Sequence, residues 1–217
     1  MSYEPIEQTS NFDLHGFVLN FSILQTESDL IHWRERQKAD VSFVPTMGGL
    51  HAGHGQLIKT ANSSKLSQKS VVIVSVFVNP LQFGPTEDFE SYPRNLQNDI
   101  ELASRSGANA LWIPSIKQIF PGGSDSVFRI QVPKKLQSQL CGSTRNGHFD
   151  GVATVMIHLL KHVKPNFLVL GEKDWQQYVI LRELIQALGL PIQVHGVATV
   201  RDSDGLALSS RNQYLNK

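Results

Sequence analysis

Hydrophobic residues along this chain form short continuous runs that alternate with helical stripes. The runs are rich in valine, isoleucine and leucine, and they occupy residues 41–44, 71–78, 110–113 and 167–170. Such runs are typical of strands buried on both faces of a parallel sheet. A further strand is predicted over residues 192–200. Residues 127–132 alternate between apolar and polar positions, which predicts a more exposed strand.

Apolar residues spaced three or four apart mark the helices between these runs. The first helix is expected over residues 27–37, with Thr26 or Ser28 as its cap. Its apolar side is formed by Leu30, Ile31 and Trp33. Further helices are predicted by the stripes at residues 57–61, 96–103, 152–163 and 176–188. The stripe over 152–163 is interpreted as core, Met156 included.

Strands that alternate with helices predict an α/β fold with a parallel sheet and right-handed crossovers. The chain has 217 residues, enough for one such domain with a sizeable core. Residues 1–17 have weak periodicity and are interpreted as an N-terminal extension. Residues 18–217 are interpreted as a single nucleotide-binding domain.

The composition of the chain argues against a nucleic-acid-binding, a membrane-spanning or a secreted protein. The formal net charge of +1 offers no electrostatic footprint for nucleic acid. The longest apolar run, residues 71–78, is too short to span a bilayer, and the N-terminus lacks the basic and apolar regions of a signal peptide. The single cysteine, Cys141, cannot form an internal disulfide, which favours a cytoplasmic protein.

The segment Pro45-Thr46-Met47-Gly48-Gly49-Leu50-His51-Ala52-Gly53-His54 joins a predicted strand to a predicted helix. A helix N-terminus with unpaired N–H groups is a favourable place for a phosphate. The Walker A and dinucleotide patterns do not fit, because their lysine and third glycine are missing. Metal ligation by His51 and His54 lacks a third ligand nearby in the sequence. A tight turn with two surface histidines remains the alternative interpretation.

Polar segments also follow other predicted strands, at residues 79–84, 171–177 and 208–211. Taken singly, each could be a solvated turn, a helix cap or a set of surface amides. In a parallel sheet, however, the carboxyl ends of the strands meet at one edge, where ligands bind. The sequence therefore predicts that these segments and the histidine loop converge on one crevice.

These segments resemble the pantothenate synthetase (pantoate–β-alanine ligase) family, which belongs to a superfamily of nucleotidyl-transferring Rossmann-like enzymes. The resemblance runs from about residue 18 to the C-terminus. It is carried by Val44-Pro45-Thr46-Met47-Gly48, Phe77-Val78-Asn79-Pro80-Leu81-Gln82-Phe83, Tyr92-Pro93-Arg94, Gly147-His148-Phe149-Asp150-Gly151-Val152, Gly171-Glu172-Lys173-Asp174 and Gly205-Leu206-Ala207-Leu208-Ser209-Ser210-Arg211-Asn212.

The resemblance implies a two-step ligation in which ATP and pantoate form pantoyl adenylate, which β-alanine then attacks. It also implies Mg²⁺ with ATP, with Asp99 as a candidate ligand, and a homodimer. The catalytic residues that it implies are His54, His51 and Lys173. The ATP-binding residues are Met47, Gly48, Gly49, Leu50, His51, Ala52, Gly53, His54, Gly171, Glu172, Lys173, Asp174, Val200, Leu208, Ser209, Ser210 and Arg211. Gln82 and Gln177 are implied to hold pantoate.

The chain also departs from the family pattern. Gly49 and Ala52 replace a common alanine and a common acid, and Asn146 replaces a common proline. Gly55 replaces a larger apolar residue at the helix start, which should cost about 1 kcal/mol of helix stability relative to alanine. The family continues beyond Lys217 into a lid domain, so this chain is expected to be a fragment of a longer protein, as in fusions with cytidylate kinase.

Two other functions remain open at this point. A domain without its lid could be catalytically silent and retain only a dimerisation role. Alternatively, a related enzyme could transfer nucleotidyl groups to another acid or to a phosphate. Gln82 and Gln177 argue against the latter, because a phosphate acceptor would favour arginine or lysine there.

Overall fold

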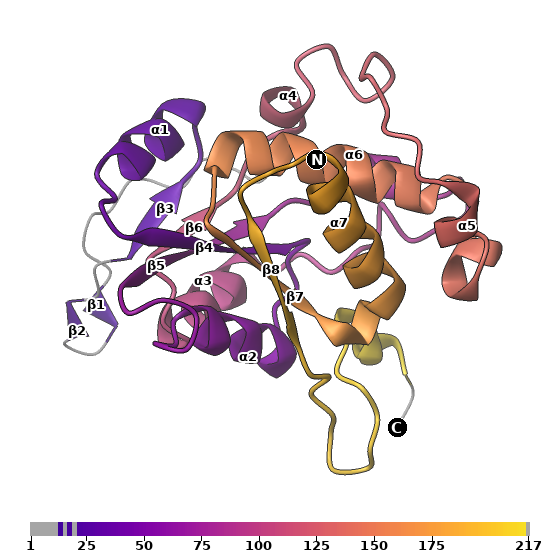
Figure 1. Ribbon diagram of the computed structural model, residues 1–217. Helices are drawn as coiled ribbons and strands as arrows, with labels where there is room; N and C mark the ends of the chain where they lie inside the picture. Colours follow the sequence, from indigo (N-terminus) through magenta and orange to yellow (C-terminus); the bar gives the residue numbers. More distant parts are fainter. Residues whose placement is uncertain (1–12, 15–16, 19–20, 216–217) are drawn as a thin grey trace.

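The computed structural model describes residues 13–14, 17–18 and 21–215 of the chain. Its main sheet has six parallel strands in the order β3-β6-β5-β4-β7-β8 (Figure 1). The strands are β3 (Ser22–Leu24), β4 (Asp40–Thr46), β5 (Ser70–Val76), β6 (Ala110–Trp112), β7 (Phe167–Gly171) and β8 (Gln193–Val197). The predicted parallel α/β fold is confirmed.

A separate antiparallel pair, β1 (Asp13–Leu14) and β2 (Phe17–Val18), lies at the boundary predicted between the N-terminal extension and the domain. The remainder of residues 1–17 lies outside the described part of the chain, and so the interpretation of this region as an extension stays a prediction.

Helices cover both faces of the sheet (Figure 1). One face carries α1 (Glu27–Glu35), α4 (Ile116–Ile119), α6 (His148–Val163) and α7 (Trp175–Ala187). The other carries α2 (Ala52–Ala61) and α3 (Leu96–Arg105), while the short α5 (Lys134–Gln137) lies beside α7. None of the helices in the described ranges has the length and hydropathy needed to cross a bilayer.

The two central strands alternate their side chains between two apolar clusters. Phe43 and Ile73 belong to the cluster that contains α1, α6 and α7. Val44 and Val74 belong to the cluster that contains α2 and α3. All four side chains are completely buried, and burial of each contributes about 1.5–3 kcal/mol. This double burial explains the continuous apolar runs in the sequence.

Helix α1 starts where the sequence predicts, but one of its apolar positions faces solvent. Thr26 is the N-cap: its Oγ1 accepts from the N–H of Asp29 at 3.0 Å, and the Asp29 carboxylate accepts from the N–H of Thr26 at 2.9 Å. Leu30 and Trp33 are buried as expected. The prediction for Ile31 is wrong, because this side chain is 48% exposed.

The exposed strand predicted over residues 127–132 is wrong. The N–H groups of Ile130 and Val132 donate to side chains of α6, namely Thr154 Oγ1 at 2.9 Å and Asp150 Oδ1 at 2.8 Å. These donors therefore pair with a helix, and residues 127–132 pair with no strand of the described residues. Of the alternating apolar residues, Ile130 and Val132 pack against the core, whereas Phe128 is 98% exposed, so the alternation does not mark one covered side.

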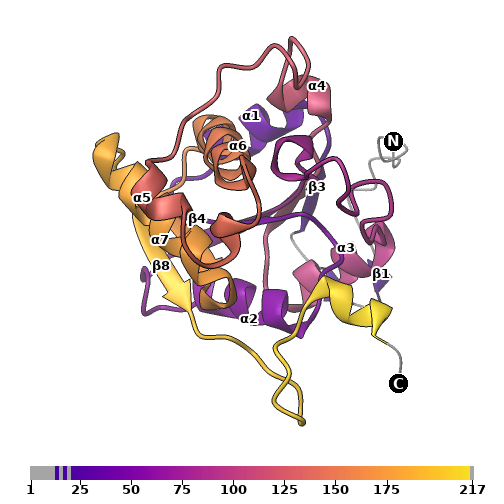
Figure 2. The ribbon, with the colours of Figure 1, turned by 90° about the vertical axis from the view of Figure 1, so that its right-hand side faces the viewer.

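The last strand is shorter than predicted, and the chain turns away from the sheet earlier as a result. Residues 198–200 leave the sheet after Val197 and start a turn that is closed by a bridge between Arg201 and Ala207. The N–H of Leu208 donates to the carbonyl of Val200 at 3.0 Å. Figure 2 shows this loop projecting from the body before residues 208–215 return to the carboxyl edge of the sheet.

Candidate active site

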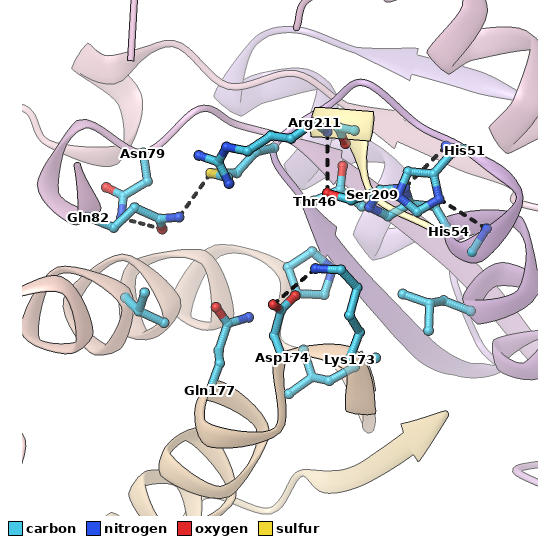
Figure 3. Close-up of a pocket in the computed structure, with 18 of the residues that line it drawn as sticks. Thr46, His51, His54, Asn79, Gln82, Lys173, Asp174, Gln177, Ser209 and Arg211 are labelled. Carbon is cyan, nitrogen blue, oxygen red and sulfur yellow. Dashed lines mark hydrogen bonds and ion pairs between the residues drawn. The ribbon is translucent and has the colours of Figure 1, made fainter. Parts of the chain in front are cut away.

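A cavity of about 250 Å³ opens at the edge where the parallel strands end. The histidine loop after β4 lines it, as do segments after β5 and β7 and the returning residues 208–211. Figure 3 shows side chains from these segments turned toward a common space. The convergence expected from the sequence is therefore present.

Two imidazole rings in the cavity wall are oriented by their own loop. Nδ1 of His51 accepts from the N–H of Gly53 at 3.1 Å, and Nδ1 of His54 accepts from the N–H of His51 at 3.2 Å. The ring centroids are 4.2 Å apart. An accepting Nδ1 leaves the proton of a neutral imidazole on Nε2. Each ring therefore has one Nε2–H donor available for a ligand.

Both rings are neutral at neutral pH. Burial, with His51 and Lys173 as further causes, lowers the pKa of His54 to about 3. Burial also lowers the pKa of His51; Lys173 acts in the same direction and Asp174 opposes it. His54 therefore suits hydrogen bonding to a phosphate better than transfer of a proton to it.

The backbone donors of the loop are largely paired within the protein. Asp99 accepts from the N–H groups of Gly49 at 3.1 Å and Leu50 at 2.6 Å, and Thr46 Oγ1 accepts from Gly48 at 3.2 Å. Gly48 and Gly49 have φ values of 84° and 62°, which favour glycine. The expectation that unpaired amides receive phosphate is wrong at these positions, and the imidazole donors face the cavity instead.

Asp99 has a different place from the metal ligand that the resemblance implied. Its carboxylate is completely buried, does not line the cavity and binds the loop from α3. The neighbouring Asn98 donates to the carbonyl of Leu50 at 3.2 Å. Burial raises the pKa of Asp99, although the hydrogen bonds from Leu50 and Gly49 oppose that shift. The structure thus makes Asp99 an anchor of the histidine loop.

A cationic group approaches the cavity from the end of β7. Lys173 lies in the 3₁₀ helix Glu172–Asp174, and its Nζ is 3.3 Å from Oδ1 of Asp174. Because this ion pair is largely exposed, it contributes little stability and a phosphate can compete with it. Gln177 follows on the first turn of α7 and points into the same space (Figure 3).

Asn79 orients the amide of Gln82. Nδ2 of Asn79 donates to Oε1 of Gln82 at 3.0 Å, while Nε2 of Gln82 lies 3.0 Å from Sδ of Met47 (Figure 3). Asn79 in turn accepts from the N–H of Leu81 and donates to the carbonyl of Gly151, both at 3.2 Å. A side chain at Gly151 would clash with the Leu81 carbonyl. Gln82 therefore turns its Nε2 group to the cavity, with one N–H directed to Met47 and the other available to a ligand.

Arg145 and His148 also line the cavity, and the sequence reasoning assigned them no role. Arg145 donates from Nε and Nη2 to the carboxylate of Glu87 at 2.8 and 2.7 Å, and its Nη1 lies 2.9 Å from Nε2 of His148. Nδ1 of His148 donates to the carbonyl of Gln82 at 2.7 Å. The motif around Gly147 contains His148, but the sequence does not indicate that this side chain contacts Gln82, which lies 66 residues away in the chain.

The apolar floor of the cavity was also missed. Helix α6 contributes Val152, Val155, Met156 and Leu159, which are buried and line the cavity as well. The interpretation of this stripe as core alone was therefore incomplete. A helical stripe gives no sign of which turn lies beneath a cavity.

Most of the expected nucleotide-binding residues reach the cavity. Those that line it are Met47, His51, Gly53, His54, Gly171, Lys173, Asp174, Val200, Leu208, Ser209, Ser210 and Arg211. Those that do not line it are Gly48, Gly49, Leu50, Ala52 and Glu172. A Cβ on Gly53 would lie 2.8 Å from Cε1 of His51, so glycine here leaves room for the imidazole ring.

Comparison with known proteins fits this geometry. The sequence profile of pantoate–β-alanine ligase matches residues 22–217. The chain belongs to the pantoate–β-alanine ligase family. Its relatives include the bifunctional pantoate ligase/cytidylate kinase of Prochlorococcus marinus strain MIT 9313, 67% identical over 183 residues, which are 84% of this chain and 36% of that protein. The corresponding protein of strain NATL1A is 53% identical over 194 residues, 89% of this chain and 38% of that protein.

Solved members of the pantoate–β-alanine ligase family share this fold. Pantothenate synthetase from Thermus thermophilus is 44% identical with a TM-score of 0.81, covering 89% of this chain and 67% of that chain. The ligase from Francisella tularensis, solved with β,γ-ATP and β-alanine, is 39% identical with a TM-score of 0.83, covering 89% and 73%. The chain spans little more than a third of the length of the curated relatives above.

Proposed function

We propose that this chain joins pantoate to β-alanine at the expense of ATP. The observation that carries the proposal is the cavity itself. Imidazole donors, Lys173 and Arg211 line it, and so do the amides of Gln82 and Gln177. Phosphate needs the first set, and a hydroxy acid needs the second.

In the first step, a carboxylate oxygen of pantoate attacks the α-phosphorus of ATP. The bond between the α-phosphorus and its bridging oxygen breaks, giving pantoyl adenylate and pyrophosphate. Negative charge on the phosphate oxygens is stabilised by positioned donors and cations. His54 and His51 supply Nε2–H donors, while Lys173 and Arg211 supply positive charge. Ser209 adds a hydroxyl donor, whereas the hydroxyl of Ser210 already donates to the carbonyl of Gly49.

Pantoate itself combines a carboxylate and two hydroxyls with a branched apolar centre. We place its polar groups against the Nε2 group of Gln82 and the amide of Gln177. Its apolar centre would rest on the floor formed by Val152, Val155 and Met156, which line the same cavity. Such a division between a few polar contacts and an apolar wall is usual for small-molecule sites.

In the second step, the amine of β-alanine attacks the acyl carbon of the adenylate. The new C–N bond forms as AMP leaves with the electrons of the acyl–oxygen bond, and the amine loses one proton. The reaction needs no nucleophilic side chain. In this proposal the protein positions the two reactants and excludes water from the acyl adenylate.

Magnesium, which the family resemblance implies, would arrive with the ATP phosphates. Within the described residues, no group of three or more histidine, cysteine or acidic side chains is arranged to hold a metal ion. Asp99 does not fit that role either, because both of its oxygens are bound to the histidine loop.

The proposal extends to the setting of the enzyme. We expect a homodimer, as the family resemblance implies, and light scattering of the purified protein tests that expectation. The single cysteine, Cys141, is consistent with the reducing cytoplasm, where ATP is available.

The decisive experiment is exchange of labelled pyrophosphate into ATP in the presence of pantoate and the absence of β-alanine. We expect exchange that depends on pantoate, because the first step needs only the groups that line the cavity. ATP binding without exchange would contradict the proposal for this chain and support a silent domain. Exchange that proceeds without pantoate would indicate a different nucleotidyl acceptor.

A matched variant ties the reaction to the cavity. His54→Ala should abolish exchange while the circular dichroism spectrum stays unchanged, because the ring faces the cavity and its loss leaves the sheet intact. Exposed His32, which lies on α1, provides the control, and His32→Ala should retain exchange. Unfolding of His54→Ala would instead indicate a structural histidine.

A further inference from the structure

Residues 208–211 form one wall of the cavity, and the segment 208–215 that contains them is fastened to the body by side chains. Ser210 Oγ donates to the carbonyl of Gly49 at 2.9 Å, which links this segment to the histidine loop. Tyr214 donates from its hydroxyl to the carbonyl of Ser91 at 2.8 Å. The segment follows the projecting loop (Figure 2), and its partners lie in the stretches of chain that precede α2 and α3.

Between these two attachments, Arg211 forms a two-pronged ion pair with Asp88. Nε donates to Oδ2 at 2.8 Å and Nη2 donates to Oδ1 at 2.7 Å. The guanidinium carbon lies 5.4 Å from the centre of the buried Tyr92 ring. A bidentate carboxylate and an aromatic face together restrict the guanidinium in both position and tilt.

This arrangement leaves part of the guanidinium available to a ligand. Within the part of the chain that the structure describes, Nη1 of Arg211 makes no hydrogen bond. Arg211 nevertheless lines the cavity, and its side chain is 45% exposed. A phosphate can therefore meet Nη1 while Asp88 keeps Nε and Nη2.

Asp88 could in principle act in either of two ways on phosphate binding. Its negative charge weakens the attraction between Arg211 and a phosphate, but the pair is partly exposed, so water and salt screen that repulsion. Without Asp88, the long arginine side chain and its segment would regain conformational freedom that a ligand must then remove. The free Nη1 and the aromatic support favour the second effect.

We propose that Asp88 is a positioning residue for phosphate binding, which fixes Arg211 over Tyr92 with Nη1 directed to the ligand. The inference rests on the proposed function for its ligand, ATP. Its structural part, the fastening of residues 208–215 by Asp88, concerns the ligand-free protein. The two parts can therefore be tested separately.

The structural part is tested by tryptic cleavage after Arg211 in the absence of any ligand. Trypsin must bind the arginine side chain, and the ion pair protects it. We expect Asp88→Asn, which is almost isosteric, to speed cleavage after Arg211 about fivefold. Cleavage after Arg201, in the exposed loop, should not change. Equal cleavage after Arg211 in the wild type and Asp88→Asn would overturn the proposal.

A neighbouring acidic residue supplies the control. Glu90 is exposed, and its carboxylate makes no ion pair within the described ranges. Glu90→Gln removes the same charge as Asp88→Asn, and it should leave cleavage after Arg211 unchanged. Asp88→Glu, which keeps the carboxylate, should restore most of the protection. Faster cleavage in Glu90→Gln as well would show an effect of charge alone and would overturn the proposal.

The ligand part is tested by titration calorimetry with ATP in a double-mutant cycle. Asp88→Asn should weaken ATP binding about fivefold. Arg211→Lys should weaken it too, since lysine cannot keep the two-pronged geometry. The double variant should bind no more weakly than Arg211→Lys. Unchanged or tighter binding by Asp88→Asn would overturn the positioning role, whereas absent binding by the wild type would count against the proposed function.

Discussion

At the scale of single residues, the protonation state of His54 connects the cavity with the stability of the fold. The ring accepts a hydrogen bond on Nδ1 and is held neutral by its surroundings. In the unfolded chain the same imidazole has its ordinary pKa near 6.5. Between pH 6.5 and about 3, the unfolded chain therefore binds a proton that the native His54 does not.

The loss of stability in acid has a definite sign and an upper limit. The free energy of unfolding should fall as the pH drops below 6.5, by at most about 1.4 kcal/mol per pH unit from this residue. His54→Asn keeps an acceptor near Nδ1 but has no titratable group, so its stability should depend less steeply on pH. Urea unfolding at pH 7 and pH 5 measures the difference, with His32→Asn as a control. Equal slopes for His54→Asn and the wild type would contradict the assignment.

The sequence predicted well which side chains line the cavity. It predicted less well which atoms each of these side chains contacts. His51, His54, Lys173, Gln82 and Gln177 all line it, as expected. Asp99 was expected at a metal, yet it holds the loop, because two N–H groups 49 and 50 positions away in the chain come within hydrogen-bond distance of it. Such partners depend on how α3 packs, which a short motif does not encode.

At the scale of elements, Gly55 controls how closely α2 approaches α3. A Cβ at residue 55 would lie 3.0 Å from Oγ of Ser106 and 3.6 Å from Cδ2 of Leu102. Glycine at this position lowers the helix propensity of α2, but the missing side chain lets the two helices approach closely. Both helices contribute to the same apolar cluster, so this approach also places the loop that joins β4 to α2.

A double-mutant cycle separates these effects. Gly55→Ala alone should stabilise the protein by less than the roughly 1 kcal/mol expected from propensity, because the new methyl group crowds Ser106. In a Ser106→Ala background, the same substitution should recover most of that gain. Urea unfolding of the wild type, both single variants and the double variant measures the coupling. Identical gains in both backgrounds would mean that the helices tolerate the methyl group without strain.

The periodicity of apolar residues predicted strands and helices well where the segment itself packs into the hydrophobic core. The continuous runs became β4, β5, β6 and β7, and the stripes became helices at nearly the expected positions. It failed over residues 127–132, where the N–H groups of Ile130 and Val132 donate to side chains of α6 and Phe128 is exposed. An alternating pattern by itself therefore does not show that a segment pairs as a strand.

At the scale of the whole molecule, the sheet and the cavity differ in how they depend on residues 208–217. The described part of this segment contributes no residue to either apolar cluster, and its fastenings are the hydrogen bonds and the ion pair on its surface. The sheet should therefore fold without it. The cavity, by contrast, takes one of its walls from this segment.

Ending the chain after Ala207 should therefore weaken ATP binding strongly and lower the melting temperature by only a few degrees, since each lost surface contact contributes about 1 kcal/mol or less. Calorimetry with ATP and a thermal melt measure the two quantities on the same sample. Loss of cooperative unfolding in the shortened chain would show that the segment is part of the core. Unaltered ATP binding would show that it is not part of the site.

The hydrogen bonds within the histidine loop should also affect the rate at which nucleotide binds. Five of its backbone N–H groups, those of Gly48, Gly49, Leu50, His51 and Gly53, are already paired with Thr46, Asp99 and the two imidazole rings before any nucleotide arrives. No rearrangement of this loop then has to precede capture of a phosphate chain. The encounter with nucleotide should accordingly speed up in proportion to nucleotide concentration, without the plateau that a slow opening step would impose.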